Sequence, residues 1–227
     1  MAAGEGSRLR PLTDVWPKPI LPIDGRPVIA TLLRELGAAG LTRVMVVTGH
    51  LAEQVEALVG DGSGFGLDVR TARQPRPDGS ADAVQTALDG GASTPAIVVV
   101  ADTVYVPGEI ARFATAFSGS GADGAVAVRA EPDPLRPEVE FGPDGLVTRL
   151  LDDSGTPLAS AALWGLGPAI APELDGLGGP PYELAEAYQR ALDLGATVIA
   201  VEVGPTRDLT HSVDLIRENF TYLSKET

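Results

Sequence analysis

Cysteine is absent from this chain of 227 residues, so disulfide bonds and thiolate metal sites are excluded. Long apolar runs are also missing. The clearest one, residues 96–101, has the length of a strand and is far too short to span a membrane. The chain opens on closely spaced glycines rather than on a basic and apolar leader. We therefore expect a soluble, cytoplasmic protein.

Positive charge is scarce, and the formal net charge is −14. Such a charge argues against nucleic acid or an anionic membrane as a partner. The distribution is uneven, because residues 1–26 hold four basic against three acidic side chains, a net of +1, which leaves −15 for the other residues. A local basic pocket in an acidic body favours a small polyanion as the ligand.

Lysine is rarer still, because two of the 17 basic side chains are lysines and the other 15 are arginines. Lys225 lies in the C-terminal tail, where we expect it to be solvated. Lys18 stands between two prolines close to the glycine-rich start. An ammonium group is a compact point charge, whereas guanidinium is a planar fork. Lys18 is therefore a candidate for a site that a guanidinium would not fit.

Short apolar segments alternate with helical patterns, which predicts an α/β fold. We expect a Rossmann-like three-layer αβα sandwich with a mixed, mostly parallel sheet. Turn residues in 131–165 predict antiparallel hairpins, which would form a small lid or acceptor lobe. The expected strands are 43–48, 67–71, 96–101, 124–129 and 197–203, and the expected helices are 27–39, 52–59, 82–88, 109–117, 168–174, 182–194 and 211–223.

The glycine-rich loop at residues 3–8 reads Ala-Gly-Glu-Gly-Ser-Arg. Glycines at this spacing let backbone N–H groups turn inward around phosphate oxygens. A dinucleotide-binding fingerprint would need a third glycine where Leu9 stands. A Walker A loop would need Gly-Lys followed by Ser or Thr, which the sequence does not contain. The loop alone indicates only that the chain binds a small anion.

A longer string gives more specificity. Residues 4–13 read Gly-Glu-Gly-Ser-Arg-Leu-Arg-Pro-Leu-Thr, and residues 17–29 read Pro-Lys-Pro-Ile-Leu-Pro-Ile-Asp-Gly-Arg-Pro-Val-Ile. Together they resemble the signature of the sugar-1-phosphate nucleotidylyltransferases, with Ser7 in place of the usual threonine. The resemblance implies an enzyme that joins a nucleoside triphosphate to a sugar 1-phosphate and releases pyrophosphate. The residues that it assigns to the nucleotide are Ala3, Gly4, Gly6 and Ser7 as binding residues, and Arg8 and Lys18 as catalytic residues.

The segment at residues 74–83 continues the resemblance. Gln74-Pro75, followed by Gly-Ser-Ala-Asp-Ala from Gly79, is similar to the family's base-reading segment. The resemblance implies that the Gln74 amide and the Gly79 backbone read the edge of the base. An amide both donates and accepts, which suits a pyrimidine-dione and favours UTP or dTTP. Glu183 matches a later acceptor-binding position of the family only weakly.

Two aspartates are the expected ligands of Mg²⁺. Asp102 follows the predicted strand 96–101, where the family places a metal aspartate, although the usual preceding glycine is Ala101 here. Asp208 resembles the second metal aspartate, again without the usual glycine. Their carboxylates are the hard oxygen ligands that Mg²⁺ prefers. His50 and His211 are far apart in the sequence and are expected to be structural.

The resemblance fails in two places. The family has a complete strand before Ala2, so we expect either that the sheet tolerates its loss or that residues precede Met1. Many members also carry Glu-Lys-Pro after the hairpin, whereas residues 150–153 contain no lysine, and their Asn-x-Gly is replaced near Ala161. We still expect one nucleotidyltransferase domain over 1–227, with a nucleotide-binding half at 1–129 and an acceptor-binding half at 130–227.

Two alternatives stay open. The compact length and the lost lysine are similar to members that act on N-acetylmuramate 1-phosphate or phosphocholine. A cytidylyltransferase for phosphocholine would need an aromatic cage, for which Trp164, Tyr182 and Tyr188 are candidates. A non-catalytic nucleotide-sensing domain would keep Gln74 and Gly79 without metal-dependent turnover. The sequence selects neither the acceptor nor an oligomeric state.

Overall fold

The computed structural model describes residues 1–130, 137–151 and 158–220. The chain forms two compact units that alternate along the sequence. Unit 1 contains residues 1–77, 100–108 and 206–227, and unit 2 contains residues 78–99 and 109–205. Among the described residues, none of the helices combines the length and the apolar character needed to cross a membrane.

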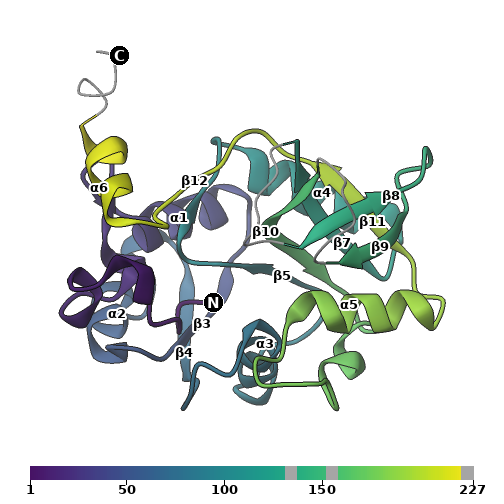
Figure 1. Ribbon diagram of the computed structural model, residues 1–227, viewed down its shortest axis with the longest axis horizontal. Helices are drawn as coiled ribbons and strands as arrows, with labels where there is room; N and C mark the ends of the chain where they lie inside the picture. Colours follow the sequence, from purple (N-terminus) through teal and green to yellow (C-terminus); the bar gives the residue numbers. More distant parts are fainter. Residues whose placement is uncertain (131–136, 152–157, 221–227) are drawn as a thin grey trace. The chain divides into compact units, whose positions relative to one another are not determined.

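Unit 1 holds three separate pairs of strands and three α-helices in its described part. Figure 1 labels α1, α2, α6, β3, β4 and β12 of this unit. Strands β3 and β4 pair in parallel, and α2 packs against both, whereas β1 pairs with β2 and β6 with β12 in antiparallel fashion. The elements are β1 (Pro22–Ile23), β2 (Arg26–Pro27), α1 (Val28–Ala38), β3 (Arg43–Thr48), α2 (Ala52–Val59), β4 (Asp68–Arg73), β6 (Thr103–Val104), β12 (Arg207–Asp208) and α6 (Ser212–Asn219).

Helix α1 shows how the sequence determines an element of unit 1. Pro27 precedes its first turn, where the missing N–H costs nothing. Val28, Leu32, Leu33 and Leu36 recur every three or four residues and are all buried. The helix therefore buries one apolar face, and its predicted bounds agree with the observed ones to within one residue.

Unit 2 is built on a six-stranded mixed sheet with the order β11-β7-β10-β8-β9, in which β5 also pairs with β10. Strands β7 and β11 are parallel, and the other described pairs of this sheet are antiparallel. The elements are α3 (Ser80–Asp89), β5 (Ala96–Val99), α4 (Glu109–Ser120), β7 (Gly124–Arg129), β8 (Glu138–Phe141), β9 (Val147–Leu151), β10 (Ala159–Leu166), α5 (Leu184–Asp193) and β11 (Val198–Glu202).

The core of unit 2 surrounds β7 and β10, in which every residue is buried. Burial on both faces explains why β7 is a continuous apolar run rather than an alternating one. Helix α4 packs against β7 and β11, and α5 packs against β9. Tyr188 of α5 is fully buried and donates its hydroxyl hydrogen to the Gly165 carbonyl at 2.7 Å. The predicted α/β class with a mixed sheet is confirmed. The expectation that the sheet would be mostly parallel is wrong for the described part of this sheet, in which β7 and β11 pair in parallel and the other pairs are antiparallel.

Some expected elements differ from the observed ones. The helix expected at 168–174 is wrong, because only Ala171–Leu174 forms one turn of 3-10 helix, whose second residue is Pro172. The strand expected at 96–101 ends at Val99, and residues 101–102 form a turn. Parts of the expected hairpins at 131–136 and 152–157, the end of the last helix at 221–223, and Lys225 lie outside the described residues.

Candidate active site

The glycine loop of unit 1 turns sharply at Gly6, whose φ is +62° and ψ +37°. A side chain there would be strained, and its Cβ would lie 3.0 Å from Thr13 Cγ2 and 3.1 Å from Lys18 Cβ. Gly4 meets no such neighbour within 4 Å. Residues Ser7–Leu9 then form a short 3-10 helix. The second glycine is therefore needed for the sharp backbone turn at residue 6, whereas the binding of phosphate by this loop stays a prediction.

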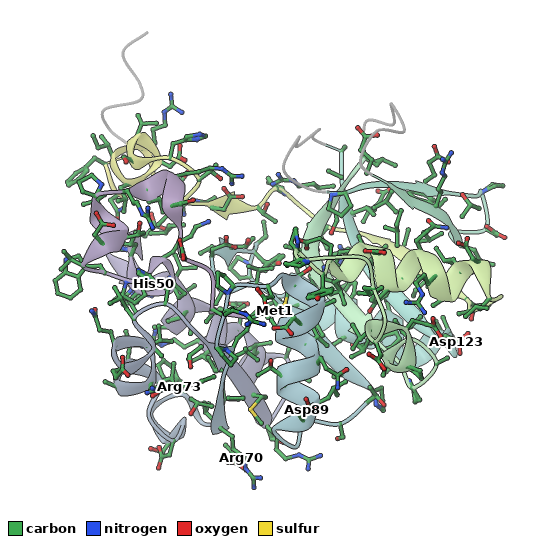
Figure 2. All side chains as sticks on the ribbon, turned by 60° about the horizontal axis from the view of Figure 1, so that its bottom comes forward. Met1, His50, Arg70, Arg73, Asp89 and Asp123 are labelled. Atoms are coloured by element: carbon green, nitrogen blue, oxygen red, sulfur yellow. The ribbon has the colours of Figure 1, made fainter. Side chains whose placement is uncertain are left out.

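Hydrogen bonds from the side chains of Thr13, His50 and Gln54 support this loop and the segment that follows it. The Thr13 hydroxyl donates to the Gly6 carbonyl at 2.9 Å, and Thr13 itself is buried. His50, labelled in Figure 2, lies with its Nε2 atom 2.6 Å from the Thr13 carbonyl, to which an N–H donates. The Gln54 amide donates to the Val15 carbonyl at 2.8 Å. His50 is thus placed as a structural residue, as expected, and Thr13 is a supporting residue that the motif alone did not single out.

Residues 1–3 align the start of the loop. The Ala2 N–H donates to the Val47 carbonyl at 2.7 Å, and Ala2 forms a parallel bridge with Thr48 of β3. On the other side, the Ala101 N–H donates to the carbonyl of Met1, which Figure 2 labels, at 2.8 Å. Residues 1–3 therefore lie alongside β3 like a short strand and lead directly into the glycine loop.

A small apolar cluster joins the loop to the segment that carries Asp208. Leu9, Leu21, Ile23, Val28 and Leu209 are all buried and pack together. Leu9 stands where a dinucleotide-binding loop would have its third glycine. Here its side chain anchors the loop in the core, so that the loop and residue 209 are fixed to the same cluster.

Lys18 and Asp102 meet although 84 residues separate them in the chain. The Lys18 Nζ atom lies 2.6 Å from Asp102 Oδ2, and the side chains are only 18% and 20% exposed. Thr103 donates its hydroxyl hydrogen to the other carboxylate oxygen of Asp102 at 3.0 Å. Two of the predicted site residues, one basic and one acidic, therefore form a largely buried ion pair within unit 1.

Asp208 lies on the neighbouring strand. In the antiparallel pair of β6 and β12, Asp208 is directly opposite Thr103, the residue after Asp102. The Thr210 hydroxyl donates to Asp208 Oδ1 at 2.9 Å. The two predicted metal ligands therefore lie on neighbouring segments: Asp208 belongs to β12, and Asp102 lies in the turn directly before β6. Within residues 1–130, 137–151 and 158–220, no cluster of three or more acidic, histidine or cysteine side chains is poised for a metal ion.

Arg207 fastens this ladder to the hairpin of β1 and β2. Its guanidinium donates two hydrogen bonds to Asp24, at 2.5 and 3.0 Å, and another to the Glu218 carboxylate of α6. The hydrogen bond from Arg207 holds the pKa of Asp24 below its ordinary value. These bonds hold the residue before Asp208 in place, and no periodic pattern in the sequence predicted them.

A cavity of about 260 Å³ opens beside the glycine loop, Lys18 and Asp102 in unit 1. It is smaller than most ligand pockets, which enclose roughly 300–1,000 Å³, and so it suits part of a nucleotide. Arg8 is exposed at its wall. The lining residues are Met1, Ala2, Gly4, Gly6, Ser7, Arg8, Leu9, Lys18, Pro19, Val100, Ala101, Asp102 and Thr210.

The residues expected at the base and the acceptor are divided between the units. Gln74 follows β4 in unit 1, is buried, and donates its backbone N–H to the Thr48 carbonyl at 2.8 Å. Gly79 and Glu183 belong to unit 2. Ala3, also in unit 1, is buried and accepts a hydrogen bond from the His50 N–H at 3.2 Å.

Two of the three candidates for an aromatic cage, Trp164 and Tyr188, pack in the core of unit 2, whereas Tyr182 is half-buried. Trp164 and Tyr188 are buried, and their ring centroids are 4.9 Å apart with an interplanar angle of 56°. Such a tilted pair is typical of aromatic packing in a core. These two rings therefore stabilise unit 2 and do not present faces to a quaternary ammonium group, which weighs against phosphocholine as the acceptor.

Comparison with known proteins gives a match to one family model. The model of the Nucleotidyl transferase family covers residues 1–150. The chain is 29% identical over 228 residues to the glucose-1-phosphate thymidylyltransferase of Streptomyces griseus, covering 96% of this chain and 64% of the relative. It is 36% identical over 152 residues to the N-acetylmuramate alpha-1-phosphate uridylyltransferase of Neisseria meningitidis serogroup B, covering 65% of each protein. The chain thus spans slightly less than two thirds of the length of these curated relatives.

Among solved structures, the fold is similar to that of a UDP-glucose pyrophosphorylase crystallised with UDP-glucose. The TM-score is 0.83 at 20% sequence identity, and the match covers 99% of this chain and 97% of that one. A likeness at this identity shows that the two proteins share the fold.

Proposed function

This chain belongs to the Nucleotidyl transferase family, and we propose that it joins a nucleoside triphosphate to a sugar 1-phosphate, giving a nucleoside diphosphate sugar and pyrophosphate. One observation supports this most: Lys18 and Asp102 meet at 2.6 Å beside the glycine loop, over a cavity lined by both. A domain that only sensed nucleotides would have no need of this pair. UTP and dTTP are the proposed donors, in keeping with a relative of each kind.

The proposed reaction is an in-line displacement at the α-phosphorus. An oxygen of the acceptor phosphate forms the new bond to the α-phosphorus, and the bond from the α-phosphorus to the oxygen bridging to the β-phosphate breaks. Pyrophosphate leaves with that electron pair. Such a transfer depends on positioning and charge neutralisation rather than on a protein nucleophile.

The residues of unit 1 divide these tasks in the proposal. The backbone N–H groups of Gly4, Gly6 and Ser7 bind phosphate oxygens around the turn at residue 6. Arg8, exposed at the cavity wall, binds the triphosphate and the leaving pyrophosphate. Lys18 bridges the α-phosphate and the acceptor phosphate, where a point charge fits between two anions.

Asp102 and Asp208 are the residues that would hold Mg²⁺. Asp102 directly precedes β6, and Asp208 of β12 pairs with the next residue, Thr103. The two carboxylates would offer hard oxygen ligands, and phosphate oxygens and water would complete the shell. The donor set therefore fits this ion. When bound, Mg²⁺ neutralises phosphate charge and polarises the α-phosphate. Lys18 must then move its ammonium group from Asp102 to phosphate.

The base and the acceptor are proposed to bind through Gln74, Gly79 and Glu183. Gln74 is buried at the end of β4, so its amide is held in place. Glu183 is exposed just before α5 and can accept hydrogen bonds from sugar hydroxyls. A single catalytic domain over both units and a cytoplasmic location stay predictions.

A substrate panel tests the proposal. The four common ribonucleoside triphosphates and dTTP are each combined with several sugar 1-phosphates and phosphocholine, and pyrophosphate release is measured with Mg²⁺. We expect release with UTP or dTTP and a sugar 1-phosphate, and loss of most of it in Lys18→Ala and Asp102→Asn. Asp144→Asn, at an exposed turn between β8 and β9, is the matched control. Silence across the panel, or normal turnover in both site variants, would contradict the proposal.

A further inference from the structure

Residues 78–81 and 182–184 of unit 2 lie side by side, although about 100 residues separate them in the chain. The Tyr182 N–H donates to the Asp78 carbonyl at 2.7 Å, and the Ala81 N–H donates to the Tyr182 carbonyl at 2.9 Å. Between these bonds, a Cβ on Gly79 would lie 2.2 Å from the Tyr182 carbonyl oxygen. The glycine is therefore needed here for the close approach of residue 182, whatever it does for the base.

Ser80 makes the next contact along this pairing. Its hydroxyl oxygen accepts the N–H of Leu184, the first residue of α5, at 2.7 Å. The same hydroxyl donates its hydrogen to Glu183 Oε2 at 2.5 Å. The N–H groups of a first helical turn need partners from outside the helix, and here Ser80 provides one from another segment. One side chain thus caps α5 and restrains the carboxylate just before it.

The restraint matters because Glu183 is exposed. An exposed glutamate samples several rotamers, and ordering it on binding costs free energy that a preformed contact reduces. The hydrogen bond from Ser80 uses Oε2, so Oε1 would accept a hydroxyl hydrogen from the sugar. Ser80 is also the immediate neighbour of Gly79, the residue proposed to read the base.

We propose that Ser80 is a positioning residue for the acceptor, because it holds the Glu183 carboxylate in place from the segment that carries Gly79. The inference rests on the proposed function and on the role of Glu183 in it. In this proposal, hydrogen bonds link the base-reading segment directly to the acceptor carboxylate within unit 2. A change at residue 80 should therefore alter acceptor binding and leave the triphosphate site of unit 1 unchanged.

Kinetics on the full chain separate this role from helix capping alone. Ser80→Ala is expected to raise the KM for the sugar 1-phosphate about tenfold, the usual effect of one hydrogen bond to a charged group, while the KM for the triphosphate changes less than about twofold. Ser80→Thr keeps the hydroxyl and should restore the acceptor KM. In a Glu183→Ala background, Ser80→Ala should add no further change, because the carboxylate that it positions is gone.

Ser120→Ala is the matched control, because the Ser120 hydroxyl also accepts a backbone N–H in unit 2, that of Ala122 at 3.1 Å, far along the chain from these segments. It should leave both KM values unchanged. An unchanged acceptor KM in Ser80→Ala, an equal rise in both KM values, or an additive effect in the Glu183→Ala background would overturn the inference alone. A wild-type protein without turnover on any sugar 1-phosphate would instead overturn the proposed function, and this inference with it.

Discussion

The ammonium group of Lys18 forms an ion pair with Asp102, one of the two residues proposed to hold Mg²⁺. Lys18 should therefore compete with the cation for this carboxylate, and removing its charge should raise the affinity for Mg²⁺. Lys18→Met removes the charge and keeps most of the apolar stem that packs beside Gly6. Asp102 is then left largely buried and without this partner. We expect the variant to be less stable than the wild type without a divalent cation, and to gain more stability than the wild type when Mg²⁺ is added.

The size of both effects follows from the contact. A hydrogen bond to a charged group contributes about 1.5–3 kcal/mol, so Lys18→Met should lower the free energy of unfolding by about 2 kcal/mol. For a chain of this size that corresponds to a fall in Tm of roughly 4–8 °C. In the variant, Mg²⁺ no longer competes with the ammonium group, so its affinity for the site should rise. At saturating Mg²⁺, each tenfold gain in this affinity adds about 1.4 kcal/mol to the free energy of unfolding.

Thermal denaturation with and without saturating Mg²⁺, in the absence of nucleotide, measures both effects. The rise in Tm on adding Mg²⁺ should be at least about 3 °C larger in Lys18→Met than in the wild type, the shift for roughly 1 kcal/mol. The double variant Lys18→Met/Asp102→Asn should lose this response, since a cation ligand is gone. An equal response to Mg²⁺ in the wild type and in Lys18→Met would refute the idea that Lys18 competes with the cation.

Three further changes test the surrounding structure. Gly79→Ala should lower the free energy of unfolding by about 2–4 kcal/mol, because φ is +115° and the new Cβ meets the Tyr182 backbone. The control Gly64→Ala places its Cβ in open space and should lower it by less than about 1 kcal/mol. Equal melting temperatures of the two variants would contradict this prediction. Ala162→Gly should change stability by less than about 1 kcal/mol despite its burial, because relief of the positive φ of +57° offsets the lost methyl contact; a loss of several kcal/mol would argue against that backbone conformation. Arg207→Ala should flatten the acid dependence of stability. Arg207 lowers the pKa of Asp24, so the pair stabilises the wild type fully above the ordinary carboxyl pKa of about 4. This stability is lost as the pH falls from there through the lowered pKa, and urea midpoints that fall equally with pH in both proteins would contradict the prediction.

The sequence predicted the bounds of helices and strands well where a clear run of apolar residues lies between turn residues. Strands β3 and β7 and helix α2 have the predicted bounds, because each is a run with a clear apolar pattern between turn residues. The 3-10 turn at Ala171–Leu174 was wrongly expected to be a longer helix. Pro172 lies in the first turn of this segment, a position where proline suits a 3-10 helix and an α-helix equally. The sequence therefore did not show that the helix would consist of this single turn.

The candidate site was predictable in its residues but not in its contacts. Lys18 and Asp102 were both selected from the motifs, yet nothing in the sequence showed that they would bind each other. The supports at Thr13 and His50 were not predictable either, because bonds from side chains to distant carbonyls follow no period. The same holds for Ser80, whose importance lies in a partner about 100 residues away.

Isotope labelling tests the central claim, nucleotidyl transfer, most directly. The protein is incubated with Mg²⁺, a sugar 1-phosphate, and UTP or dTTP that carries ³²P in either the α or the γ position. We predict that the α label appears in a nucleoside diphosphate sugar and the γ label in pyrophosphate. Recovery of the γ label on the sugar or as inorganic phosphate, with the α label left in a free nucleotide, would contradict the account.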